Sequence, residues 1–97
     1  HTHVPALFHM SMTGKFASFE PVDRIDIPLT RQRRWLAVIG AVGQPRDRNP
    51  RAAYAIYDTE ARIWTPRRVA YNIPEVQQRI REAGLPEKHA IRIAEGW

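Results

Sequence analysis

The feature that most constrains the fold is an apolar run from Trp35 to Val42 that does not alternate with polar residues. Arginines precede the run and Gly43-Gln44-Pro45 follows it, so its length suits a short strand better than a helix. A strand that is apolar on both sides has to be covered on both faces. The run therefore predicts a central strand in a layered fold of the α/β or α+β class.

Alternating segments predict further strands around this run. Val4–Met12 is apolar at every even position, which indicates a half-buried strand, and Thr13-Gly14-Lys15 supplies a turn after it. Pro66 lies inside the last of the predicted strands and favours an edge or bulged strand there, because proline cannot donate to a ladder. Strands are also predicted at Phe16–Phe19, at Asp23–Leu29 and in a hairpin of Ala52–Tyr57 with Arg62–Tyr71, the strand that contains Pro66.

Two helices are predicted at the end of the chain. Pro74 can open the first helix, and Gly84 is placed to end it as a glycine just past the last turn. Pro86 opens the second helix, which leads towards Trp97. The fold class is therefore α+β, a β-sheet with two C-terminal helices. Because no repeat or linker interrupts the chain, we expect a single domain.

The chain has 97 residues, enough for one domain at most. It contains no cysteine, which excludes thiolate metal sites, argues against a stapled secreted domain and favours a cytoplasmic location. No apolar stretch approaches the roughly 20 residues that span a bilayer, so no membrane partner is expected. The first residue is His1 rather than Met, so we expect the chain to be part of a longer protein.

A formal charge of +5, supplied mostly by arginine, suggests an anionic partner. The arginines are scattered, so a solvated surface explains most of them. The alternative function is a small basic nucleic-acid-binding module, in which arginines contact phosphates and Trp35, Trp64 and Tyr71 stack on bases. The chain has no recognition-helix pattern that would favour this alternative.

Two short motifs can carry chemistry. His1-Thr2-His3 could turn both imidazoles into one site for zinc, manganese, iron or nickel, although exposed histidines at a frayed terminus are the simpler interpretation. A copper-chelating amino terminus at His1 is a further alternative. The loop Gly40–Asp47 leaves the apolar run, and Gly43 and Arg46 in it could contact phosphate. Its simpler interpretation is a turn in which Gly43 supplies a positive φ.

The two motifs together resemble the calcineurin-like metallophosphoesterase superfamily in its small bacterial branch. Members carry Gly-His-Thr-His, commonly followed by Val-Pro, and residues 1–5 read His-Thr-His-Val-Pro. Members then carry Gly-Ser-Val-Gly-Gln-Pro-Arg-Asp, and residues 40–47 differ from it only at Ala41. Residues 49–55, 67–71 and 80–86 also resemble that branch, so the resemblance leaves only residues 9–34 unconstrained.

The resemblance implies the C-terminal part of an αββα domain that hydrolyses phosphoesters. His1 and His3 would each bind one of two divalent ions (manganese, iron, nickel or zinc), held about 4 Å apart. The family's other ligands lie in an N-terminal half that is not in this sequence, so that half is the expected partner and the segment alone is expected to be inactive. His9 and His89 match no family ligand. The substrate class, whether diester, monoester or dinucleoside polyphosphate, and a homo-oligomeric state stay open.

Two departures from the family pattern weaken the phosphate side of the loop. Val38-Ile39 stands where members often have Asn-Pro, and Ala41 replaces the serine, so both polar contributions are absent. Contacts to phosphate would then come from the backbone at Gly43 and from Arg46.

Overall fold

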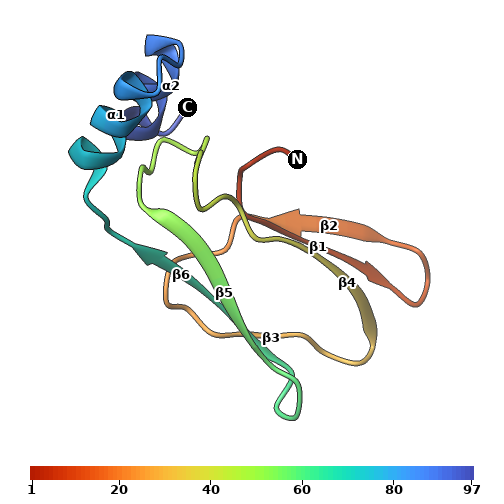
Figure 1. Cartoon of the computed structure of the whole chain (residues 1–97). Helices are drawn as coiled ribbons and strands as arrows, with labels where there is room; N and C mark the ends of the chain where they lie inside the picture. The colour runs from red at the N-terminus through yellow and green to blue at the C-terminus, as the bar shows by residue number, and fades with distance from the viewer.

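The computed structural model describes residues 1–97 as two small antiparallel sheets followed by a helical hairpin (Figure 1). One sheet has the order β2-β1-β4 and the other the order β3-β6-β5. The α+β class predicted from the sequence is confirmed. The elements are β1 (Ala6–Ser11), β2 (Phe16–Phe19), β3 (Ile27–Pro28), β4 (Arg33–Val38), β5 (Ala52–Asp58), β6 (Ile63–Val69), α1 (Ile73–Glu82) and α2 (Glu87–Glu95).

The core lies between the two sheets and is small. Leu7 of β1 is fully buried and packs with Trp64 of β6, and Ile27 and Leu29 complete the buried cluster. Because these side chains come from both sheets, the sheets pack through one face each. Their other faces point away from the core.

The sequence predicts a central strand at the apolar run that begins at Trp35, and this prediction is wrong. The run forms β4, which is an edge strand. β4 pairs only with β1, and the strand ends at Val38 while the rest of the run continues into a loop. Leu36 is 64% exposed and Val42 is 68% exposed. The apolar pattern indicates that the side chains of Leu36 and Val42 favour burial, but no other part of this chain buries them.

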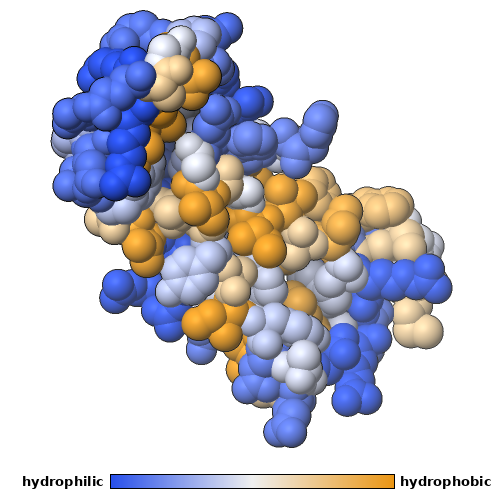
Figure 2. All heavy atoms as spheres, in the orientation of Figure 1, coloured by the Kyte–Doolittle hydropathy of each residue, from blue (hydrophilic) through white to orange (hydrophobic).

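The half-buried strand predicted at Val4–Met12 is present as β1, but its buried face is the opposite one. Leu7, at an odd position, enters the core, whereas Phe8 is partly exposed and Met12 is 89% exposed. The even face of β1 is therefore an apolar surface that faces away from the core. In Figure 2, apolar side chains form a band across the middle of the visible face, between the polar helices and the polar ends of the hairpins.

The predicted hairpin of β5 and β6 is confirmed, with Asp58 accepting hydrogen bonds from two backbone N–H groups of its turn. The edge position predicted for the strand with Pro66 is wrong, because β6 is the central strand of its sheet. β3 spans only two residues and pairs with Ile63 and Trp64, so Pro66 lies beyond the end of β3. A proline is tolerated there since that side needs no ladder donor.

The two predicted helices are confirmed and pack against each other rather than on a sheet (Figure 1). Asn72 caps α1 by accepting a hydrogen bond from the Glu75 backbone N–H, and Gly84 follows α1 with a positive φ. α2 is fixed to the loop before β5 where Arg48 N–H donates to the Gly96 carbonyl at 2.8 Å. Neither helix is long and apolar enough to cross a bilayer.

Candidate functional site

The two sequence motifs lie side by side in the structure, although more than forty residues separate them. Nδ1 of His3 is 2.9 Å from the carbonyl oxygen of Gln44, and the backbone N–H of Arg46 donates to the carbonyl oxygen of His3 at 3.2 Å. The N-terminal segment thus runs along the loop between β4 and β5 (Figure 1). We name residues 40–47 the motif loop.

The contact with Gln44 determines which nitrogen of His3 is free. A carbonyl oxygen can only accept, so Nδ1 of His3 carries the proton and donates, which leaves the lone pair on Nε2. Histidines that bind metals usually have this arrangement, with the second ring nitrogen fixed by a carbonyl or carboxylate. The donor chemistry of His3 therefore fits a divalent metal ion bound through Nε2.

The backbone at His3 is also constrained. His3 has a φ of 61°, which is uncommon for a residue with a Cβ and is stable only where surrounding contacts maintain it. Its carbonyl and its ring both bond to the motif loop, so the loop holds this conformation. His1 is exposed and makes no hydrogen bond within the chain.

The glycine with the special role in the motif loop is Gly40 rather than Gly43. Gly40 has a φ of 100°, and a Cβ there would lie 2.9 Å from Cγ of Pro5 and 3.0 Å from Cβ of Ala53. Gly43 has no positive φ, which makes that interpretation of the sequence wrong. At Gly40 the motif loop therefore passes close to Pro5, in the segment that follows His3.

Gly43 and Arg46, from which the sequence predicts phosphate contacts, both lie exposed on the motif loop. No heavy atom comes within 4 Å of the position that a Cβ on Gly43 would take. The Arg46 guanidinium has no ion pair or hydrogen bond within the chain, while its backbone N–H is used by His3. The loop therefore presents an open backbone and an unpaired planar cation beside His3.

A buried ion pair closes the end of the motif loop, and no sequence pattern predicts it. Asp47 accepts from the guanidinium of Arg68 on β6, and both side chains are only 8% exposed. Arg68 also donates to the carbonyl oxygen of Arg51 at 2.9 Å. Burial lowers the pKa of Arg68, and the nearby carboxylates of Asp23 and Glu20 offset only part of this effect. No local pattern marks Arg68, because its partner is 21 residues away.

The chain contains only part of a metal site. No three side chains of the His, Cys, Asp or Glu type come together anywhere in it. His1 and His3 therefore belong to no such group within this chain. A site for two divalent ions needs further ligands from elsewhere.

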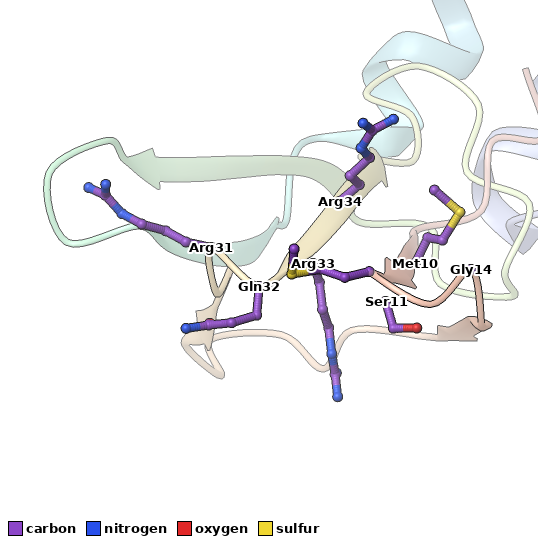
Figure 3. Close-up of a pocket in the computed structure, with 8 residues that line it drawn as sticks. Met10, Ser11, Gly14, Arg31, Gln32, Arg33 and Arg34 are labelled. Carbon is purple, nitrogen blue, oxygen red and sulfur yellow. The ribbon is translucent and has the colours of Figure 1, made fainter.

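The largest hollow lies at the other end of β1, away from the motif loop (Figure 3). It has a volume of about 420 Å³ and is lined by Arg31, Arg33 and Arg34, together with Gln32 and residues of the β1–β2 turn. None of these arginines forms an ion pair, and in Figure 3 their guanidinium groups point in different directions. β1 has six residues, so at 3.3 Å per residue it separates this hollow from the segment that contains His3 by about 20 Å.

The chain is similar over its whole length to part of a solved structure, the metallophosphoesterase from Sphaerobacter thermophilus. The two share 40% sequence identity with a TM-score of 0.86, and the match covers 100% of this chain. The chain spans 40% of the length of that relative. No protein-family profile and no curated protein matches the chain.

Proposed function

The fold of the chain is that of a segment of a metallophosphoesterase, and on this premise we propose that it forms one side of the active site of a phosphoester hydrolase with two metal ions. The observation that supports this most directly is the contact between His3 and Gln44, which leaves Nε2 of His3 available to a metal. His3, which belongs to the motif that carries the family resemblance, therefore has the hydrogen bonding that is usual for a metal-binding histidine.

In this proposal, His3 holds one divalent ion through Nε2 and His1 holds the other. The ions supply Lewis-acid activation of the phosphate and of the attacking water when they are bound. The chain's own contribution is to orient the histidines. The motif loop fixes the ring of His3 through Gln44 and its backbone through Arg46, so the imidazole needs little reorganisation on binding.

The motif loop also forms the phosphate side of the proposed site. Arg46 is unpaired and can offer two parallel N–H donors to a phosphate, and Gly43 leaves space for close approach to the backbone. Arg46 and the backbone at Gly43 would contact the phosphate group itself and not the groups esterified to it. They therefore support a phosphoester substrate without distinguishing a monoester from a diester.

The remaining metal ligands are proposed to lie in the part of the protein that corresponds to the rest of the relative's chain. Two histidines without a carboxylate cannot hold two divalent ions. We expect the 97 residues alone to hydrolyse no bis-p-nitrophenyl phosphate in the presence of Mn²⁺. Turnover by this segment at rates above a sample without protein would contradict the need for a second half.

The proposal is tested by substituting His3 in the full protein in which this sequence occurs. We expect His3→Gln to lower Mn²⁺ or Zn²⁺ affinity by more than about 100-fold, since loss of a direct ligand should exceed the effect of losing its supporting contacts. Isothermal titration calorimetry measures this, with His89→Gln on α2 as the control that should leave affinity unchanged. Equal affinity in wild type and His3→Gln would refute the role of His3.

A second candidate function is nucleic-acid binding, which the unpaired arginines at the large hollow favour. Their guanidinium groups point apart, so they suit separate phosphates along a chain better than one small anion (Figure 3). The test is oligonucleotide binding at several salt concentrations. Salt-sensitive binding that disappears in R31A/R33A/R34A but persists in R79A/R81A/K88A would favour this function, and no salt-sensitive binding would remove it.

A further inference from the structure

We propose that Asp47 and Arg68 form a clamp that positions His3 for metal binding, which makes Arg68 a positioning residue of the proposed site. The metal in this statement rests on the function proposed above. The effect on the His3 ring does not, because it can be observed without metal. Neither residue is assigned this role by the similarity to the metallophosphoesterase.

The clamp joins β6 to the end of the motif loop. Arg68 belongs to β6, and Asp47 ends the motif loop. The same arginine donates to the Arg51 carbonyl at 2.9 Å, and its backbone N–H donates to Asp23 at 2.9 Å. One side chain on a central strand thereby fixes both ends of the segment from residue 47 to residue 51.

The clamp is connected to His3 through the three residues before Asp47, which are Gln44, Pro45 and Arg46. Pro45, the middle one of the three, is fully buried and anchors this part of the motif loop in the interior. Arg46, next to Asp47, donates its backbone N–H to the His3 carbonyl, and Gln44 accepts from the His3 ring. A displacement of Asp47 would therefore change the position of both groups that hold His3.

Arg68 is the only cation that forms an ion pair with the carboxylate of Asp47. One carboxylate oxygen, Oδ2, accepts from Arg68, and the other, Oδ1, is buried without any donor. A buried carboxylate with one free oxygen is stable in this position only while its cation is present. Loss of Arg68 should therefore expel Asp47 from its site and release the motif loop, rather than leave the loop in place.

The experiment compares four proteins, each as the full protein that contains this sequence: wild type, Arg68→Met, Arg68→Lys and Arg79→Met. Arg79 forms an exposed ion pair with Glu75 on α1, so its substitution makes the same chemical change away from the motif loop. Long-range ¹H–¹⁵N correlation spectra of the metal-free proteins report the tautomer of His3. Calorimetry with Zn²⁺ or Mn²⁺ reports affinity.

In wild type and in Arg79→Met we expect His3 to carry its proton on Nδ1. In Arg68→Met we expect a mixture of tautomers and metal affinity lower by about 10- to 100-fold, which is typical for loss of an outer contact of a metal ligand. Arg68→Lys should partly restore the Nδ1 tautomer of His3 and the metal affinity, because lysine has the positive charge of arginine but not its planar set of N–H donors. If Arg68→Met does not fold, Asp47→Asn replaces it, with the same expected changes.

A folded Arg68→Met protein with an unchanged His3 spectrum and unchanged affinity would overturn the clamp. If the wild type binds neither metal, the proposed function fails, whereas the tautomer of His3 still decides whether the clamp positions the ring. The two failures are therefore distinguishable. A loss of affinity in Arg79→Met as large as that in Arg68→Met would also contradict the proposal, since it would indicate a general effect of lost charge.

Discussion

At the residue scale, the site depends on close contacts between the N-terminal segment and the motif loop. His3 is bonded through its ring and its carbonyl, and Gly40 lets Pro5 pass within van der Waals distance. The sequence identifies His3 and the motif loop as separate features. It does not show that they touch, because nothing local encodes a hydrogen bond between residues 3 and 44.

We expect Gly40→Ala to destabilise the protein by about 2 to 4 kcal/mol, which combines left-handed backbone strain with overpacking. The added Cβ would lie 2.9 Å from Pro5 Cγ at a φ of 100°. The matched control is Gly43→Ala, three residues along, where a Cβ meets nothing within 4 Å. Urea unfolding measures both, and equal destabilisation of the two variants would show that the Pro5 contact is unimportant.

At the element scale, hydrophobic pattern identifies most strands and both helices but assigns two of the strands to the wrong surroundings. β4 is apolar on both sides yet lies at a sheet edge, and β1 buries its odd face although its even face is the more uniformly apolar. Pattern reports that a side chain favours burial. The pattern does not indicate which neighbouring element buries that side chain.

The helical hairpin contains an ion pair that should make its stability depend on pH. The hydrogen bond with Arg81 lowers the pKa of Glu87 below its ordinary value of 4.5, and both side chains are on the surface. A carboxyl with a lowered folded pKa adds stability above its unfolded pKa and loses it as the pH falls through its folded pKa. We therefore expect the melting temperature of wild type to fall more steeply than that of Glu87→Gln below pH 4.5.

Circular dichroism melts across this acid range give the comparison. Glu82→Gln is the control, because Glu82 on α1 accepts only from the neutral Gln78 and forms no ion pair. It should keep the wild-type slope. Identical slopes for all three proteins would mean that solvent screening removes the contribution of the pair.

At the scale of the whole molecule, the chain is too open for its size. Its accessible surface is 6773 Å², against about 5,700 Å² for a compact monomer of this mass. Its radius of gyration is 16.2 Å, against about 12.5 Å for a compact chain of this length. The excess surface includes the even face of β1 with its neighbours Phe16 and Leu36. We propose that a segment corresponding to the rest of the relative's chain covers this face.

We expect the isolated 97-residue chain to self-associate through this apolar face. Leu36→Lys and Phe16→Lys should each lower the mean mass measured by size-exclusion chromatography with light scattering. Val22→Lys is the control, since Val22 is equally exposed at 64% but lies outside the sheets. In the full protein, Leu36→Lys should instead lower the melting temperature, and no change there would contradict burial of this face.

The sequence by itself determined the α+β class, the order of the elements and the residues of the motif, because hydrophobic period, turn residues and a short motif are all local properties. Only the tertiary structure determined that His3 rests on the motif loop, that Arg68 holds Asp47 and that the apolar run is an edge. These depend on contacts between distant residues, and their geometry follows from the packing of the two sheets rather than from any one segment.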